Sequence, residues 1–397
     1  MRILQVTPYF APAWAYGGPP RVMFDYAVGL AALGHQVDVL TTDVLDAEHR
    51  AAPAVEVMDG VRVRRLPNVS NSLAWRTKKY LPRGLVRRLG REIAGYDAVH
   101  VTDTRTYLTA AAYVAARARG VPFCLSAHGS LPGSAGLRGL VKRAYDTVLV
   151  RPMLEHAAIL LAQTDHEADL YRRFGGAQDA IKLLPLPLDL DEIDSAPVRG
   201  ALHRLAGLHD TVRIILFLGR IHWLKGLDIL IEAVAPLLDG RRTALVVVGR
   251  DDGQRTELAR RYARLVDSGG IHFVGPLYGR DRFPAYADAD VFCLTPRHWE
   301  ETSVAALEAA ACGTAVVVTE QSDIPGLSTS GGGFVAKLDP DAIRSAVVAA
   351  LEHPEMGALA AAHVRAQHAK EAVVARLETY LEEAVARRSA ARAGRRR

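Results

Sequence analysis

The chain has few cysteines, and none lies at a spacing that binds metal or forms a redox pair. Cys124, Cys293 and Cys312 are the only three among 397 residues, and each lies in an apolar segment. Scattered cysteines of this kind are typical of reduced core residues. The sequence therefore predicts a protein of a reducing compartment, without a disulfide framework.

Long apolar runs are missing as well. No run approaches the length of about 20 residues that is needed to cross a bilayer. The first residues, Met1 to Val6, are apolar too briefly for a signal peptide, and Pro8 and Pro12 follow at once. We expect a cytoplasmic protein that contacts the inner face of the cell membrane, if at all, only peripherally.

Apolar residues make up 49% of the chain, which is enough to bury two ordinary α/β cores. Apolar runs of strand length alternate with helical patterns in both halves, and this alternation predicts doubly wound parallel sheets. The expected strands are 3–6, 37–40, 61–66, 98–101, 123–127 and 159–162 in the first half, and 213–218, 245–248, 271–274, 291–294, 315–318 and 334–335 in the second.

Proline punctuation marks the expected boundary between two domains. The stretch from Leu184 to Asp191 alternates leucine with proline and aspartate, as is typical of an interdomain linker. We place the first domain at 1–190 and the second at 191–365. Residues 366–397 would form a last helix, part of one amphipathic run from about 361 to 386, and a basic tail ending Arg395-Arg396-Arg397.

The stretch from Trp299 to Gly313 lies between two expected strands and is predicted to form a short crossover helix. The first amides of such a helix face the carboxyl edge of the sheet, where they stabilise an anion. Glu300 lies before the helix, where it can accept hydrogen bonds from sugar hydroxyls. Glu308 lies nearly two turns in, where it can accept from both hydroxyls of a ribose. The structural alternative is that Glu300 and Glu301 favour the helix N-terminus by their charge and that Glu308 is solvated.

Two cations flank another turn of the second half. Arg220 and Lys225 follow the strand 213–218, within Gly219-Arg220-Ile221-His222-Trp223-Leu224-Lys225-Gly226. Fixed cations at the carboxyl edge of a sheet would neutralise a diphosphate, most of all as it gains charge on leaving. A structural ion pair is the alternative.

Three segments together resemble one family. Glu300 and Glu308 match the E-x7-E signature of the retaining GT-B glycosyltransferases, specifically family 4. The segment from Gly219 to Gly226 matches the family's G-R-x4-K-G segment, and Tyr9-Phe10 through Gly17-Gly18 matches its N-terminal glycine loop. These segments occur in the family's order and cover most of the chain.

The resemblance implies a fold and an activity. The fold is GT-B, in which two Rossmann-like, doubly wound parallel-sheet domains face a cleft. The activity is transfer of a hexose from a nucleoside diphosphate sugar, such as a UDP- or GDP-sugar, to a hydroxyl of a lipid-linked or polysaccharide acceptor. The resemblance implies that this transfer is a front-face displacement, in which the leaving diphosphate itself takes the acceptor proton. No metal or other cofactor is expected, and no nucleic acid.

The resemblance also assigns roles to residues. Arg220 and Lys225 would stabilise the diphosphate, and Glu308 would hold the ribose. The sugar would be held by Glu300 and the amides near Thr302, Ser303 and Val304, two of which depart from the family, since Thr302 is commonly aromatic and Ser303 commonly glycine. His128, at the end of the strand 123–127, would contact the sugar near the anomeric carbon. The loop at Gly17 and Gly18 would approach the donor, although a turn without a ligand needs glycine too.

Two Asp-x-Asp strings have the pattern with which other glycosyltransferases hold a divalent cation. Asp189-Leu190-Asp191 lies in the expected linker, and Asp288-Ala289-Asp290 lies at the amino end of the strand 291–294, away from the ligand edge. We interpret both as turn and cap residues.

The segment from Arg62 to Arg91 contains ten basic residues and no acidic one. Apolar and aromatic residues are interleaved, a pattern that suits an anionic membrane surface. The residues expected at this membrane or acceptor surface are Arg76, Lys78, Lys79, Arg83, Arg87 and Arg88. A solvated arginine-rich face is the alternative. Two rival functions also stay open: a non-catalytic protein that binds membranes or polyanions, and a transferase with a small-molecule acceptor.

Overall fold

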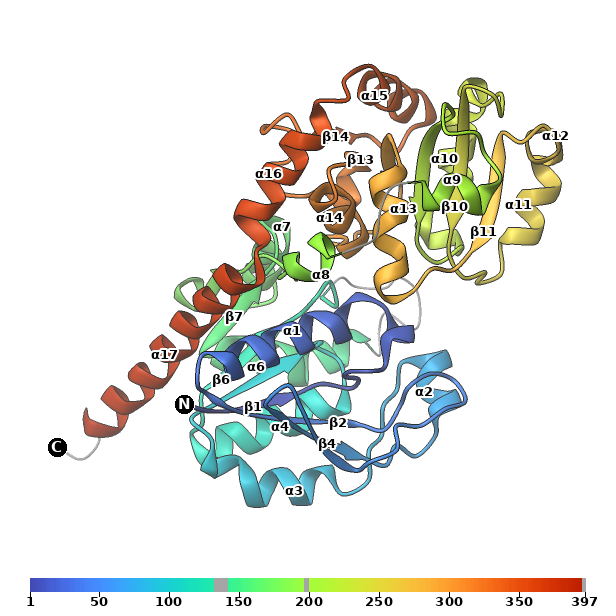
Figure 1. Ribbon diagram of the computed structural model, residues 1–397. Helices are drawn as coiled ribbons and strands as arrows, with labels where there is room; N and C mark the ends of the chain where they lie inside the picture. The colour runs from blue at the N-terminus through green and yellow to red at the C-terminus, as the bar shows by residue number, and fades with distance from the viewer. Residues whose placement is uncertain (132–141, 196–199, 395–397) are drawn as a thin grey trace. The chain divides into compact units, whose positions relative to one another are not determined.

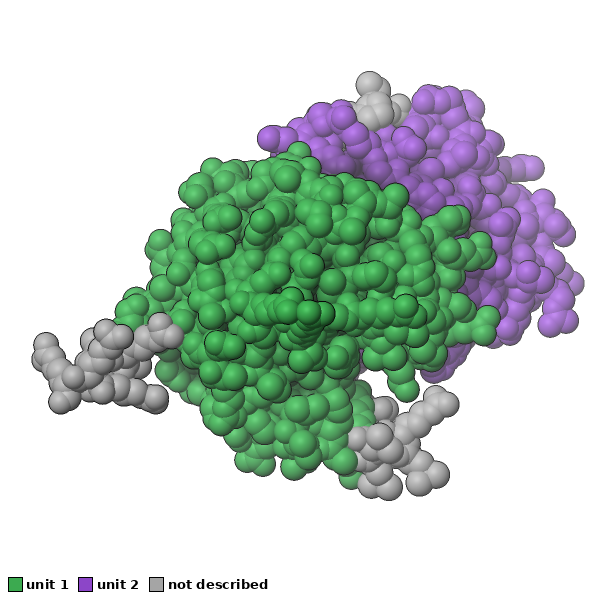
Figure 2. Space-filling model, turned by 90° about the horizontal axis from the view of Figure 1, so that it is seen from below, with its two compact units in different colours: residues 1–187, 370–397 green, residues 188–369 purple. Residues whose placement is uncertain are grey.

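The computed structural model describes residues 1–131, 142–195 and 200–394. The chain forms two compact units, shown in green and purple in Figure 2. Unit 1 comprises Met1–Pro187 and Lys370–Arg397, and unit 2 comprises Leu188–Ala369. The expected basic tail at Arg395 to Arg397, and the end of the loop that begins at His128, lie outside the described residues.

Unit 1 is built on an eight-stranded sheet in the order β3-β4-β2-β1-β5-β6-β7-β8, in which only the β3–β4 pair is antiparallel. Its strands are β1 (Arg2–Val6), β2 (Gln36–Thr42), β3 (Val55–Met58), β4 (Val61–Leu66), β5 (Ala98–Thr102), β6 (Phe123–Ser126), β7 (Ile159–Ala162) and β8 (Ile181–Leu183). The strands β2, β3 and β4 lie on one side of β1, and the strands β5 to β8 lie on the other side. The strand order therefore reverses between β1 and β5, which is where open α/β sheets bind ligands.

Helices cover both faces of this sheet (Figure 1). Helices α1 and α17 pack together, and so do α3 and α4. The α-helices that the structure describes in unit 1 are α1 (Gly18–Ala32), α2 (Asn71–Thr77), α3 (Leu85–Glu92), α4 (Tyr107–Arg119), α6 (Arg151–His156), α7 (Asp165–Arg173) and α17 (Lys370–Gly394). Because both faces are covered, the central strands are near-continuous apolar runs, as in the fully buried β7.

Unit 2 has a six-stranded parallel sheet in the order β11-β10-β9-β12-β13-β14. Its strands are β9 (Arg213–Leu218), β10 (Thr243–Val248), β11 (Ile271–Gly275), β12 (Val291–Leu294), β13 (Ala315–Thr319) and β14 (Gly333–Ala336). Its helices are α8 (Leu190–Asp194), α9 (Ala201–Ala206), α10 (Leu227–Val234), α11 (Arg255–Arg261), α12 (Ala263–Asp267), α13 (Arg282–Asp288), α14 (Val304–Ala311), α15 (Pro340–Glu352) and α16 (Met356–His368). Here the strand order reverses between β9 and β12.

All twelve expected strands are present, and the prediction of two doubly wound parallel sheets is confirmed. Helix α2 ends at Thr77, followed by Lys78 in a left-handed conformation, and Pro82 and Gly84 lie in the segment before α3 begins at Leu85. Two strands were missed. β3 has both of its valines exposed, Val55 and Val57, and β8 is only three residues long, so neither forms a clear apolar run.

The prediction of one helix from about 361 to 386 was wrong. The run is divided between α16 and α17 because Ala369 adopts a non-helical conformation, with ψ at 125°. Leu377 and Leu381 of α17 are fully buried, whereas Tyr380 is partly exposed and donates its hydroxyl to the Leu183 carbonyl at 3.2 Å. Within the described ranges no helix combines the length and the apolar character needed to span a bilayer.

Candidate functional site

Two loops meet at the carboxyl edge of the unit 2 sheet, where β9 and β12 lie side by side. The first runs from Gly219 to Gly226 and the second from Thr295 to Ser303. Gly226 has a φ of +67°, and a Cβ there would lie 1.9 Å from the Thr295 carbonyl oxygen. Only glycine fits this contact, because any side chain would push the two loops apart. The glycine of the G-R-x4-K-G segment thus brings the loops together.

Lys225 and Glu300 join the two loops. The Lys225 Nζ lies 2.7 Å from Glu300 Oε2, and the side chains are 20% and 11% exposed. The Glu300 backbone is fixed in turn, since its amide donates to the Gln321 carbonyl at 2.8 Å. The structure therefore places the expected diphosphate lysine beside the expected sugar glutamate. The ion pair that sequence reasoning held as an alternative is present and lies at the ligand edge.

Arg220 follows β9 on the same loop and is half exposed. Its Nη1 donates to Asp252 Oδ2 at 2.8 Å, and Asp252 belongs to the loop after β10. A guanidinium carries five N–H donors, and this bond uses one of them. Asp252 therefore orients the Arg220 side chain and leaves donors for an anionic ligand.

Glu308 lies on α14 with its side chain only 7% exposed. Arg282 of α13 binds it through two parallel bonds, of 2.6 Å to Oε1 and 2.8 Å to Oε2, and the Tyr286 hydroxyl donates to Oε2 at 3.1 Å. Burial, together with the Glu308 charge, raises the pKa of Tyr286 well above its usual range, so its hydroxyl stays a donor. Because a carboxylate offers about four acceptor positions, three are used and Oε1 keeps one.

Sequence reasoning missed Arg282 and Tyr286. They lie 26 and 22 residues before Glu308 on another helix, and their positions follow no local pattern. They matter because a paired, hydrogen-bonded glutamate keeps one fixed orientation.

The N-terminus of α14 faces the same edge. Ser303 caps it, with its side-chain oxygen accepting from the Ala306 amide at 3.5 Å, and Thr302 and Ser303 are nearly buried. Glu301 before them has a left-handed φ of +56°, which turns the chain into the helix. The amides of Val304 and Ala305 have no hydrogen-bond partner within the described ranges. These two amides are therefore available to an anion, and the binding that the sequence predicts for them stays a prediction.

His128 lies in unit 1, just after β6, with a φ of +48°. Its Nδ1 lies 2.6 Å from the Gln163 side-chain amide, while Nε2 is buried without a partner among the described residues. Burial lowers the pKa of His128 to about 4, so the ring is neutral at physiological pH. With the Gln163 amide donating to Nδ1, the proton lies on Nε2. The ring is therefore a hydrogen-bond donor at the carboxyl edge of the unit 1 sheet.

The glycine loop begins α1. Gly17 has a φ of +94° and precedes the first helical residue, Gly18. A left-handed conformation at this position favours glycine for the turn itself. The structure thus gives Gly17 a conformational role, and its contact with the donor stays a prediction.

Three of the four carboxylates of the Asp-x-Asp strings accept from backbone amides, and that of Asp189 is the helix cap that the sequence predicted. Asp189 caps α8 by accepting from the Glu192 amide at 3.0 Å. Asp288 accepts from the Gly200 and Leu202 amides, and Asp290 accepts from the Ile214 amide at 2.7 Å.

The basic segment of unit 1 divides into two parts. Its first three arginines lie on β4 and pair with acidic side chains: Arg62 with Asp38, Arg64 with Glu92, and Arg65 with Glu56. The later basic residues include four that are exposed and carry no ion pair in the described structure: Arg76, Lys79, Arg83 and Arg87. Arg88 lies 3.8 Å from Glu92, and Lys78 lies over the rings of Tyr16 and Trp75.

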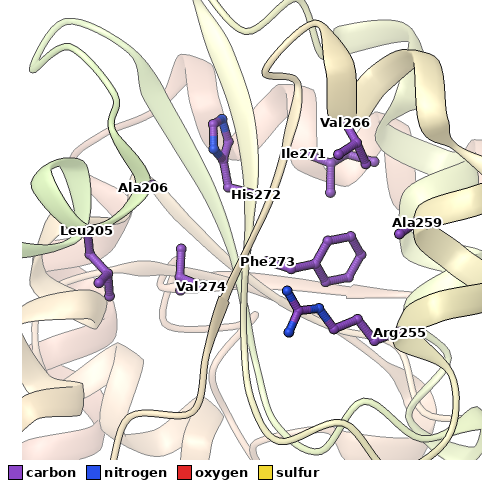
Figure 3. A pocket seen from close by; sticks show the side chains of 9 residues that line it. All are labelled: Leu205, Ala206, Arg255, Ala259, Val266, Ile271, His272, Phe273 and Val274. Atoms are coloured by element: carbon purple, nitrogen blue, oxygen red, sulfur yellow. The ribbon is translucent and has the colours of Figure 1, made fainter.

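A separate hollow lies at the edge of unit 2, beside β11 (Figure 3). It is lined by apolar residues such as Leu205 and Val266, and Arg255 lies over the Phe273 ring at 5.8 Å. None of the residues that the sequence singled out lines it. The candidate site is therefore the edge between β9 and β12.

Comparisons with known proteins cover both units. Residues 212–353 match the family described as "Glycosyl transferases group 1", and residues 17–187 match the "Glycosyl transferase 4-like domain". A D-inositol 3-phosphate glycosyltransferase of Xylanimonas cellulosilytica is 31% identical over 323 residues, which cover 76% of this chain and 75% of the relative.

Solved structures share the fold over almost the whole chain. Sucrose-phosphate synthase from Thermosynechococcus elongatus aligns with a TM-score of 0.74 at 21% identity, covering 97% of this chain and 100% of that one. The Anabaena protein HepE in complex with UDP-glucose aligns with a TM-score of 0.72 at 17% identity, covering 96% and 99%.

Proposed function

The chain belongs to the group 1 glycosyltransferases of the GT-B fold, and from this membership we propose that it moves a hexose from a nucleoside diphosphate sugar to an acceptor hydroxyl with retention of the anomeric configuration. One observation carries the proposal. Arg220, Lys225 and the first amides of α14 converge on the carboxyl edge of unit 2 where the strand order reverses.

The diphosphate is the group that this edge would bind. In the proposed reaction the bond from the anomeric carbon to the diphosphate breaks, and the acceptor oxygen bonds that carbon on the same face. The acceptor proton passes to a diphosphate oxygen. Arg220, Lys225 and the Val304 amide would stabilise the charge that the leaving group gains, and fixed donors act most strongly on such developing charge.

The two glutamates would hold the remaining parts of the donor. Glu300 Oε2 is engaged by Lys225, so Oε1 is the atom we assign to sugar hydroxyls. Glu308 has about one acceptor position left, on Oε1, and we assign it to one ribose hydroxyl rather than two. By family resemblance, the Nε2 proton of His128 would donate to the donor sugar, and Gly17 and Gly18 would let backbone approach it.

A panel of nucleotides tests the donor assignment. UDP-glucose is the first candidate, since the similar protein HepE was solved with it. We expect one of the UDP, GDP, TDP or ADP sugars to raise the melting temperature, because a ligand at 100 times its Kd stabilises the folded state by about 2.7 kcal/mol. The Lys225→Ala variant should lose most of this shift. Failure of every nucleotide to raise the melting temperature would contradict the proposal.

The acceptor in this proposal is a saccharide, lipid-linked or part of a polysaccharide, and unit 1 would contact an anionic membrane. Three apolar side chains, Leu73, Leu81 and Val86, are 39%, 40% and 58% exposed among the exposed cations of the basic segment. Cations near an anionic membrane contribute about 1 kcal/mol each.

Vesicle binding tests this surface. The charge reversal Arg83→Glu with Arg87→Glu should abolish sedimentation with anionic vesicles. The control is the same reversal at Arg241 and Arg264, two exposed arginines of unit 2. Equal loss in both variants would mean that net charge alone drives binding. The Lys225→Ala variant distinguishes the non-catalytic alternative, because it should lose sugar transfer and keep vesicle binding.

A further inference from the structure

The strand order of unit 1 reverses between β1 and β5, and the loops after these two strands carry a cluster of aromatic and charged side chains. We define the aromatic cluster as Tyr9, Tyr16, Trp75, Lys78, Tyr80 and Asp103. Tyr9 follows β1 and Asp103 follows β5 directly, and the Tyr9 hydroxyl donates to Asp103 Oδ2 at 3.2 Å. This hydrogen bond therefore spans the position at which an open α/β sheet binds a ligand.

Rings converge on Tyr16. It stacks on Tyr9 with the ring centroids 5.1 Å apart and an interplanar angle of 18°, and it meets Trp75 edge to face at 5.1 Å and Tyr80 at 6.0 Å. Tyr9 and Tyr80 are buried, whereas Tyr16 and Trp75 are partly exposed. The cluster thus has a packed base, and two of its rings, those of Tyr16 and Trp75, are partly exposed to solvent.

Three features of the cluster are unusual for a purely structural core. Asp103 has a left-handed φ of +63°, a strained conformation of the kind that is concentrated at functional sites. The hydroxyls of Tyr16 and Tyr80 are buried and have no hydrogen-bond partner among the described residues. Burial also raises the pKa of Asp103 to about 6. The protein therefore maintains a strained, partly desolvated carboxylate at a ligand-binding edge.

Among the described residues, the cluster itself holds one carboxylate and one ammonium, and the carboxylate of Asp46 also acts on Tyr16. Asp103 and Lys78 interact with each other, and Lys78 lies 5.0 Å and 5.3 Å from the centroids of Tyr16 and Trp75. Arg105, close by in sequence, is already engaged by Asp146 and by the carbonyls of Ser130 and Leu131. A phosphate would require several available cations, whereas one carboxylate beside one ammonium suits a neutral ligand.

We propose that the aromatic cluster is the acceptor site and that it binds a neutral sugar ring, which lies against Trp75 and Tyr16 while one of its hydroxyls donates to Asp103. A sugar ring has an apolar C–H face, which the negative face of an aromatic ring attracts, and hydroxyls around its rim. This inference rests on the proposed function and names the acceptor class for it. It separates this chain from relatives whose name specifies an inositol phosphate.

Binding measurements on the full chain test the proposal without requiring activity. We would titrate neutral methyl glycosides of glucose, mannose, galactose and N-acetylglucosamine, and separately myo-inositol 3-phosphate, and follow binding by saturation-transfer NMR. At least one neutral glycoside should show saturable binding. Asp103→Asn and Trp75→Ala should each weaken it tenfold or more, and Trp75→Phe should restore part of the affinity.

Asp97→Asn is the matched control. Asp97 precedes β5 as Asp103 follows it, so the two carboxylates lie at opposite ends of one strand, and Asp97 accepts from the Arg2 amide. Unchanged affinity in Asp103→Asn and Trp75→Ala would overturn the proposal. So would tighter binding of myo-inositol 3-phosphate than of every neutral glycoside, or no saturable glycoside binding at all.

Failure of the proposed function would look different. If no nucleotide binds unit 2 while a glycoside binds the aromatic cluster, the proposed transfer reaction is contradicted and the proposed sugar site is supported. If nucleotides bind, Lys225→Ala abolishes their binding and no glycoside binds, then only the acceptor assignment is contradicted and the proposed function is supported.

Discussion

Asp103 is a residue whose binding role and stability contribution should oppose each other. Its pKa is raised by burial to about 6, from an ordinary value of 3.8. A carboxyl whose folded pKa is raised stabilises the fold below pH 3.8, and that contribution is lost as the pH rises through 6. Asparagine carries no charge and tolerates a left-handed conformation. The Asp103→Asn variant should therefore unfold at a higher temperature than the wild type at pH 7.5, and this gain should vanish near pH 4.

The same titration predicts how acceptor binding depends on pH. An ionised Asp103 can accept a hydrogen bond from a sugar hydroxyl at either oxygen, whereas a protonated Asp103 has fewer acceptor positions. Glycoside affinity should fall as the pH is lowered from 7 through about 6. In Asp103→Asn the affinity should be low and independent of pH over this range. A wild-type profile that stays flat would argue against contact with this carboxylate.

Arg282 neutralises the nearly buried carboxylate of Glu308 and holds it in place. Removing the guanidinium leaves a nearly buried carboxylate with only the Tyr286 hydroxyl, and breaking a buried pair in this way costs about 3–5 kcal/mol. Arg282→Ala should lower the free energy of unfolding in urea, and Glu308→Gln in that background should recover part of the loss. The control Arg260→Ala removes an exposed arginine and should change little. Equal stability in both variants would mean that the pair carries no net energy.

At the scale of an element, Gly226 fixes the conformation of the loop from Gly219 to Gly226. A methyl group at position 226 would lie 1.9 Å from the Thr295 carbonyl oxygen, in a left-handed conformation that itself costs about 1–2 kcal/mol. Gly226→Ala should therefore separate the two loops and weaken nucleotide binding, measured by calorimetry, more than it lowers the melting temperature. Gly207→Ala is the control, since it also has φ +67° but nothing within 4 Å of its Cβ. Similar nucleotide affinity in both variants would contradict this account.

Elements also show what could be read from the sequence. The parallel strands were predicted because strands covered on both faces are apolar runs, and β9 and β12 matched their expected ranges to the residue. The crossover helix α14 followed from its two neighbouring strands. The pairs Arg282–Glu308 and Tyr9–Asp103 could not be predicted, because their partners lie 26 and 94 residues apart and only the fold brings them together.

At the scale of the whole molecule, each sheet places polar side chains at the point where its strand order reverses. In unit 2 these are Arg220, Lys225 and Glu300, with the cations suited to a diphosphate. In unit 1 they are Asp103 and Lys78, which our proposal assigns to a neutral sugar ring. The formal net charge of +5 adds a general attraction to anionic surfaces, which salt should screen. In this proposal the chemistry of the donor belongs to unit 2 and that of the acceptor to unit 1.

The central claim is that Lys225 stabilises the departing diphosphate. The rate at which labelled sugar leaves the nucleotide identified in the thermal-shift panel tests it most directly. Lys182→Ala is the control, because Lys182 likewise pairs with a glutamate, Glu383, at 3.0 Å but lies in unit 1. Lys225→Ala should slow the reaction about 10²–10³-fold, and Lys182→Ala should leave it within twofold. An undiminished rate in Lys225→Ala would contradict the account.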